Sequence, residues 1–110
     1  MKNKEKHAMG NYLEAGAAMR LLTEVGNKAI SAASAILSAK DADKFVHYLN
    51  GLDLLKAKAD TNLFDDYPEL GHEGTNVFYG RLKDKPESDL DTEVINMAKA
   101  MAEDLFNRRG

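Results

Sequence analysis

Apolar and small side chains recur alternately four and three residues apart through the first third of the chain, and this spacing restricts the fold more than any other feature. The series consists of Ala8, Tyr12, Ala15, Met19, Leu22, Gly26, Ala29, Ala33 and Ile36. Such spacing keeps one stripe of a helix facing a partner helix. It predicts one long helix over about residues 5–37.

A second apolar stripe lies beside the first on the same predicted helix. Its members are Met9, Leu13, Leu21, Val25, Ala32 and Ala35. A helix that is apolar on two sides is normally buried on two sides, and the few helices of a 110-residue chain cannot cover both. We therefore expect a homo-oligomer, most simply a dimer. The expected interface consists of Ala15, Met19, Leu22, Gly26, Ala29, Ala33 and Ile36.

The sequence S-x-x-D at Ser38–Asp41 resembles a capping box and predicts the start of a second helix. Apolar residues with helical spacing follow it: Phe45, Tyr48 or Leu49, Leu52, Leu55, Ala59 and Leu63. A bend near Ser38 would fold this helix back on the first as an antiparallel hairpin. The alternative is a single continuous rod, and the hairpin is the preferred interpretation.

Residues 60–80, the acidic–aromatic segment, differ from both predicted helices. The segment contains no Lys or Arg, and half of the eight aromatic residues of the chain fall within it. Residues that break regular structure also gather here: Pro68, Gly71, Gly74 and Gly80. We expect an irregular connection with short helical turns near residues 63–67 and 75–82.

A second S-x-x-D sequence at Ser88–Asp91 predicts a capped C-terminal helix. Its apolar stripe comprises Leu90, Val94, Met97 or Ala98, Met101 and Leu105. The predicted fold is therefore all-α: one helical domain over residues 1–110, with residues 1–6 as a frayed tail. It is a small bundle built on a long helical hairpin plus the capped C-terminal helix.

Composition excludes several classes of protein. The chain has no Cys, so it has no disulfide framework, thiol nucleophile or thiolate zinc site. A net charge of −3 argues against a nucleic-acid or membrane-surface role. No targeting segment is visible, and no apolar run approaches the roughly 20 residues that a bilayer requires. We expect a cytoplasmic protein.

Catalytic and metal-binding motifs are weak. The chain lacks the G-x-S-x-G elbow and both glycine-rich phosphate-loop fingerprints, so we expect neither an enzyme nor a cofactor. Glu69 and His72 have the E-x-x-H spacing of di-iron bundles, but the pair occurs once, and Pro68 and Gly71 interrupt the helix that it requires. We therefore expect no metal.

The leading hypothesis is a non-enzymatic interaction module (an adaptor, regulator or inhibitor) that binds another protein through the acidic–aromatic segment. Its candidate partner-binding residues are Phe64, Asp65, Asp66, Tyr67, Glu69, His72, Glu73, Phe78 and Tyr79. Alternatively, the four aromatic residues form a satellite core that closes the hairpin. Small acidic helical proteins are typical of bacterial and phage accessory proteins, an analogy of size and class.

Two other functions stay open. A ligand-binding bundle could hold an anion through Arg81, Lys83 and Lys85, or a metal through carboxylates and His72. DNA binding through the N-terminal lysines is the weaker of the two, because Glu5 offsets a tail of three lysines.

Overall fold

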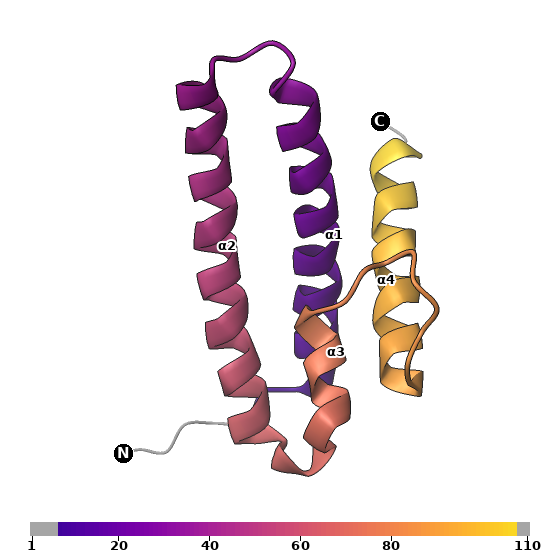
Figure 1. Ribbon diagram of the computed structural model, residues 1–110. Helices are drawn as coiled ribbons and strands as arrows, with labels where there is room; N and C mark the ends of the chain where they lie inside the picture. Colours follow the sequence, from indigo (N-terminus) through magenta and orange to yellow (C-terminus); the bar gives the residue numbers. More distant parts are fainter. Residues whose placement is uncertain (1–6, 108–110) are drawn as a thin grey trace.

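The computed structural model describes residues 7–107, and within that range the chain is folded into helices joined by short connections (Figure 1). The helices are α1 (Met9–Ala33), α2 (Ala39–Asp66), the 3-10 helix η1 (Pro68–Gly74), α3 (Thr75–Phe78) and α4 (Asp89–Phe106). The prediction of an all-α bundle is confirmed. The predicted frayed tail, residues 1–6 with its three lysines, lies outside the described residues.

Helices α1 and α2 form the predicted antiparallel hairpin, and the continuous rod is excluded (Figure 1). Helix α1 ends at Ala33, and the amides of Ile36 and Leu37 both donate to its carbonyl oxygen, which turns the chain. The Ser38 hydroxyl then accepts a hydrogen bond from the Asp41 amide at 3.1 Å. This contact satisfies one of the free N–H groups at the start of α2, as the sequence predicts.

Helix α4 begins in the same way and runs in the same direction as α1 (Figure 1). The Ser88 hydroxyl accepts from the Asp91 amide at 3.0 Å. Val94 and Ala98, both in the predicted apolar stripe, are fully buried. Leu105, near the end of the stripe, is largely exposed because α4 extends beyond the core.

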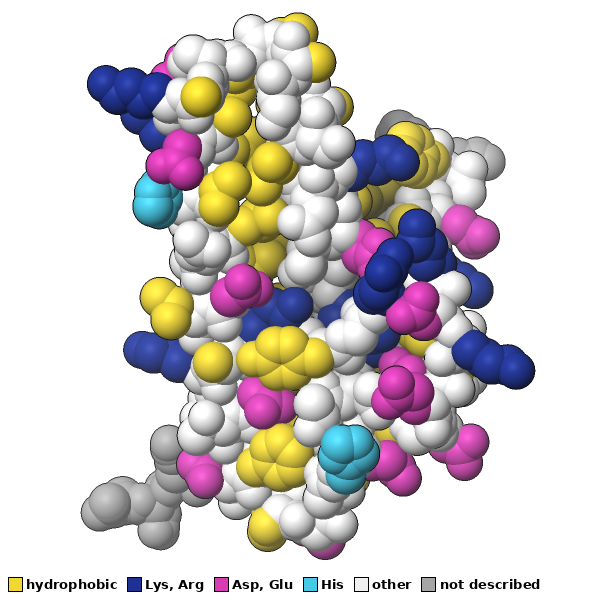
Figure 2. Space-filling model, in the orientation of Figure 1, with side chains coloured by type: hydrophobic (Ala, Val, Ile, Leu, Met, Phe, Trp, Pro, Cys, Tyr) yellow, Lys and Arg dark blue, Asp and Glu magenta, His cyan; other side chains and the backbone are white. Residues whose placement is uncertain are grey.

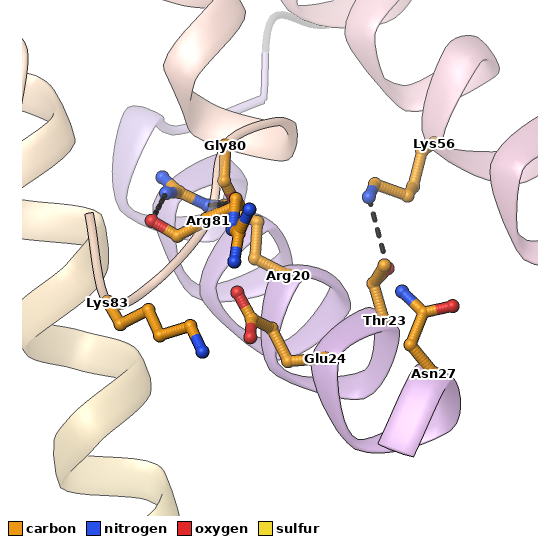
Figure 3. A pocket seen from close by; sticks show the side chains of 8 residues that line it. All are labelled: Arg20, Thr23, Glu24, Asn27, Lys56, Gly80, Arg81 and Lys83. Carbon is orange, nitrogen blue, oxygen red and sulfur yellow. Dashed lines mark hydrogen bonds between the residues drawn. The ribbon is translucent and has the colours of Figure 1, made fainter. Parts of the chain in front are cut away.

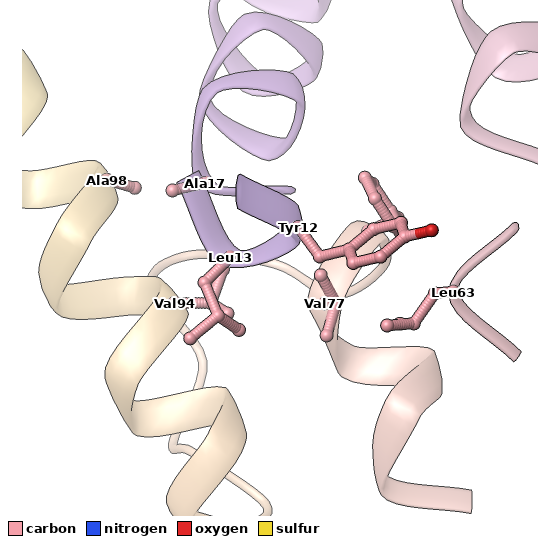
Figure 4. Close-up of a cluster of buried hydrophobic side chains, with 8 residues drawn as sticks. Tyr12, Leu13, Ala17, Leu63, Val77, Val94 and Ala98 are labelled. Atoms are coloured by element: carbon pink, nitrogen blue, oxygen red, sulfur yellow. The ribbon is translucent and has the colours of Figure 1, made fainter. Parts of the chain in front are cut away.

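The core lies around the N-terminal half of α1, where the end of α2, α3 and α4 meet (Figure 4). Its buried members are Tyr12, Leu13, Ala17, Leu63, Val77, Phe78, Val94 and Ala98. The C-terminal half of α1 has less cover. There, Figure 2 shows apolar side chains along the junction between α1 and α2 that remain at the surface. No helix within residues 7–107 has the length and apolar character needed to cross a bilayer.

The acidic–aromatic segment is more regular than predicted. Helix α2 continues through Asp66, so residues 60–66 are helical rather than irregular. The physical reason is Leu63, which is fully buried in the core and extends the buried face of α2 by one more turn. Pro68 then begins η1, and Gly71 interrupts it with a φ of 59°. The second expected turn is shorter than predicted and stops at Phe78.

Candidate functional site

Arg20 is the most heavily hydrogen-bonded side chain of the bundle, although it is only 1% exposed. Its Nη1 donates to Asp91 Oδ1 at 2.8 Å and to the Asn76 carbonyl at 2.6 Å. Nε donates to the Gly80 carbonyl at 3.0 Å, and Nη2 lies 3.4 Å from the carbonyl of Arg81. One buried guanidinium therefore joins α1 to the end of α3, to the following loop and to the first turn of α4.

Two carboxylates bind backbone amides of the loop between α3 and α4. Glu24 Oε2 accepts a hydrogen bond from the Leu82 amide at 2.7 Å. Asp91 Oδ2 accepts from the Glu87 amide at 2.9 Å. The loop between α3 and α4 is thus fixed against α1 by side chains buried or half-buried beneath it.

The fixed loop closes one side of a basic cavity of about 430 Å³ between α1 and α2 (Figure 3). The lining residues are Arg20, Thr23, Glu24, Asn27, Lys56, Gly80, Arg81 and Lys83. Four of these eight residues are cationic, and Glu24 is the one carboxylate among them. We refer to this feature as the basic cavity.

Lys56 is the unusual member of the cavity, because it is a lysine that is only 5% exposed. Its Nζ donates to Thr23 Oγ1 at 3.1 Å and lies 5.1 Å from the centroid of the Tyr79 ring. Burial lowers the pKa of Lys56, the negative charge of Asp53 partly opposes that shift, and the positive charge of Arg20 adds to it. The ammonium group is therefore held where water solvates it poorly.

Two further ionisable groups lie close to this lysine in the fold. Burial raises the pKa of Asp60, and its Oδ1 has no hydrogen-bond partner within the described part of the chain. Burial also raises the pKa of Tyr79, and the carboxylates of Asp60 and Asp53 add to that shift. Tyr79 therefore keeps its hydroxyl proton and can act as a hydrogen-bond donor.

Only two of the three cations of the predicted anion site lie at the same cavity. Arg81 and Lys83 line the basic cavity, whereas Lys85 does not. Sequence reasoning missed Lys56, although α2 carries a detectable pattern. The predicted series places Leu55 between Leu52 and Ala59, but Leu55 is 55% exposed and Lys56, the next residue, is buried in its place. Lys56 keeps the alternating four-and-three spacing, so its burial follows from helical periodicity. Tyr48, the alternative to Leu49 in that series, is also exposed.

Eight of the nine candidate partner-binding residues fall into three groups by burial. Phe78 is fully buried in the core, where no partner can reach it. Phe64, Tyr67 and Tyr79 are half-buried, which agrees in part with the alternative that these aromatics complete the core. The exposed group contains Asp65, Glu69, His72 and Glu73.

Asp66 is tied into the bundle instead of pointing freely into solvent. Its Oδ2 accepts hydrogen bonds from the Tyr12 hydroxyl at 2.6 Å and from the His7 amide at 3.1 Å. Burial and the bond to Asp66 raise the pKa of the Tyr12 hydroxyl well above its ordinary value. The Tyr67 hydroxyl donates to the His7 carbonyl at 2.9 Å. These two residues of the segment hold the start of α1 against the end of α2.

The residues of the predicted oligomer interface are only partly exposed. Gly26 is buried against α2, and a Cβ placed there would lie 2.7 Å from a methyl carbon of Leu49. Met19, Ala29 and Ala33 are half-buried, whereas Ala15, Leu22 and Ile36 are exposed. Gly26 is therefore used within the chain and is not available to a second copy.

An open apolar groove of about 470 Å³ instead lies between α1 and α4. Its lining consists of Ala18, Leu21, Leu22, Val25, Met101, Asp104 and Leu105. Leu22, Val25 and Leu105 are 53%, 56% and 66% exposed. This groove contains Leu22 of the predicted interface and Val25 of the second apolar stripe, so part of each stripe remains uncovered.

Metal ligands are sparse in the described part of the protein. Residues 7–107 contain no group of three or more His, Asp or Glu side chains that could hold an ion. Glu69 and His72 are exposed on η1. Asp43 Oδ2 and His47 Nε2 lie 3.3 Å apart on the exposed surface of α2, as side chains four residues apart on a helix can.

Comparisons with protein-family models, with curated proteins and with solved structures find no match for this chain.

Proposed function

We propose that this chain is a non-enzymatic protein-interaction module that acts as a homodimer and binds a partner protein through the acidic–aromatic segment. The apolar groove between α1 and α4 carries the proposal. Three large aliphatic side chains at its edge are more than half exposed, and Asp104 is its single charged residue. Burying one such side chain is worth about 1.5–3 kcal/mol, so this surface favours a partner.

A second copy of the chain is the occupant that suits the groove. In a two-fold dimer each partner contributes the same surface, so residues of one groove would cover those of the other. Because α1 and α4 are roughly side by side and run in the same direction, two such pairs can pack as a four-helix layer (Figure 1). Leu22 and Leu105 would then lie at the centre of the interface.

The partner-binding surface lies at the other end of the molecule. The acidic–aromatic segment forms the lower end of the bundle (Figure 1), whereas the groove is lined by residues 18–25 in the middle of α1 and residues 101–105 of α4. Figure 2 shows acidic side chains and a histidine beside apolar side chains near that lower end. Asp65, Glu69 and Glu73 are exposed there, which suits a partner with a basic surface. A cytoplasmic location completes the proposal and agrees with a chain that contains no Cys.

Leu22→Glu is expected to convert the dimer to a monomer, because it places a carboxylate at the centre of an apolar interface. Sedimentation equilibrium over a range of protein concentrations measures the change, and far-UV circular dichroism checks that the helices persist. The matched control is Leu54→Glu, since Leu54 is 70% exposed on α2 and lies outside the groove. It should remain a dimer. A wild-type chain that is monomeric at all concentrations would refute the dimer.

Reversing two exposed acids, in the double variant Glu69→Lys/Glu73→Lys, is expected to abolish partner binding without altering the fold. Neither carboxylate makes a hydrogen bond or ion pair within the described residues, so stability should change by no more than about 0.5 kcal/mol. The measurement is cross-linking and affinity capture from the native cells, followed by titration of the captured protein. Glu93→Lys/Glu103→Lys, on the exposed surface of α4, is the control of equal charge. Equal affinity of both double variants would contradict this role of the segment.

A further inference from the structure

We propose that the basic cavity is a binding site for a small phosphorylated ligand, with Lys56 at its inner wall and Arg81 and Lys83 at its rim. This inference does not depend on the dimer or on the exposed acids of the acidic–aromatic segment, although Tyr79 and Gly80 of that segment lie at the cavity. It rests on a buried cation without a carboxylate partner, on further cations that surround the same space, and on a loop that is held rigidly beside it.

The buried ammonium group of Lys56 is the first observation. Buried lysines are almost always paired with an anion, because an unpaired charge loses its hydration. No carboxylate of the described residues lies within 4.0 Å of this Nζ, and Asp53 influences it only from a distance. Thr23 Oγ1 accepts one of its three hydrogens. The ammonium group also lies over the face of the Tyr79 ring, and no second hydrogen-bond acceptor for this Nζ is found among residues 7–107.

The charges of the lining are the second observation. Arg20 is paired with Asp91 behind the cavity, so its charge is already compensated. Three cations and Glu24 then remain, which leaves an excess of two positive charges. Arg81 also approaches Asp84, but that contact is 3.9 Å long and exposed, so it contributes little.

The chemistry of the ligand follows from this excess. A phosphate monoester carries about −1.5 to −2 charges near neutral pH and offers three strong acceptor oxygens. A single carboxylate would compensate Lys56 alone and leave the rim cations without a role. The cavity volume of about 430 Å³ lies within the range of about 300–1,000 Å³ that is usual for small-molecule sites.

The position of the rim is the third observation. Arg20 holds the carbonyls of Gly80 and Arg81, and Glu24 holds the amide of Leu82. In Figure 3, Arg81 and Lys83 lie on the loop side of the cavity near Glu24, and Lys56 lies on its α2 side beside Thr23. A loop that is fixed before binding loses little conformational entropy when the ligand enters.

Lys56→Met tests the site, because methionine fills a buried position without a charge. The full-length chain, Lys56→Met and Lys58→Met are unfolded thermally in inorganic phosphate or glycerol phosphate, against chloride of equal ionic strength. Lys58→Met loses the same charge from an exposed position of the same helix. Ligand at about 100 times its Kd should raise the Tm of the wild type and Lys58→Met by about 10 °C. Lys56→Met should show no such rise.

The matching readout is the chemical shift of backbone amides on titration with glycerol phosphate. Shifts at Thr23, Gly80 and Arg81 that saturate in the wild type, and an affinity about tenfold or more weaker in Lys56→Met, would support the site. Equal rises of Tm in all three proteins would overturn it, since phosphate stabilises most folded proteins through exclusion from their surfaces. Tighter binding of a phosphoserine peptide than of glycerol phosphate would overturn the small-molecule assignment.

Discussion

Arg20→Met is expected to lower the free energy of unfolding by about 3–5 kcal/mol, the largest loss we expect from a substitution of one charged side chain. Methionine matches the aliphatic part of arginine but donates no hydrogen bonds. Asp91, which is 4% exposed, would keep a buried charge without its cation, and the carbonyls of Asn76 and Gly80 would lose their donor. Urea unfolding followed by circular dichroism measures the loss.

Two comparison variants isolate the cause. Lys44→Met removes a cation from the exposed pair with Asp41, whose atoms are 3.9 Å apart, and should change stability by no more than about 0.5 kcal/mol. Arg20→Met/Asp91→Asn removes both buried charges and should be more stable than Arg20→Met alone, because no unpaired carboxylate remains. If Arg20→Met costs no more than Lys44→Met, the guanidinium does not organise the bundle as we describe.

Arg20 also connects the fold to the basic cavity. The carbonyls that it binds belong to the loop that carries Arg81 and Lys83, so its loss should release the rim as well as weaken the core. An Arg20 variant that fails to bind phosphate would therefore say nothing about Lys56. This is why the test of the cavity uses Lys56 and leaves Arg20 intact.

The elements that the sequence predicts well depend on local chemistry. The hydroxyls of Ser38 and Ser88 each accept a hydrogen bond from the backbone amide three residues later. This contact can be predicted without the rest of the fold, because both groups belong to the same helix start. The hairpin follows because the bend near Ser38 separates two long apolar series. In each case the interacting groups are close in sequence, and the periodicity specifies which side chains face inward.

The candidate site depends on contacts between distant parts of the chain. Arg20 and Asp91 are 71 residues apart, and no local pattern pairs them. Phe78 and Tyr79 are adjacent in sequence, but Phe78 is fully buried and Tyr79 is half-buried. The orientation of the short helix α3 decides which of the two side chains enters the core. The anion site also depends on residues that are distant in sequence. Arg81 and Lys83 at its rim belong to a basic run that the sequence shows, whereas Lys56 lies on α2 and approaches them only in the folded chain.

Gly16→Ala is expected to destabilise the protein by about 2–3 kcal/mol, although alanine normally favours a helix by about 1 kcal/mol over glycine. Gly16 lies where α3 crosses α1, and an added Cβ would overlap the carbonyl oxygen of Val77 and lie 2.7 Å from its Cγ1. The carbonyl belongs to the backbone of α3, so a side-chain rotation cannot relieve the overlap. The two helices must move apart, and the packing of Phe78 against the core is lost with them.

Gly51→Ala is the matched control, because Gly51 lies within α2 and an added Cβ would meet no atom within 4 Å. The same chemical change should there raise the free energy of unfolding by about 1 kcal/mol, since only helix propensity acts. Urea unfolding of the two variants under identical conditions should therefore give shifts of opposite sign. If both substitutions stabilise the protein, α3 does not pack against Gly16. The position that we describe for the following loop, beside the basic cavity, would then be wrong as well. The close contact at one glycine thus tests both the packing of the core and the placement of the candidate site.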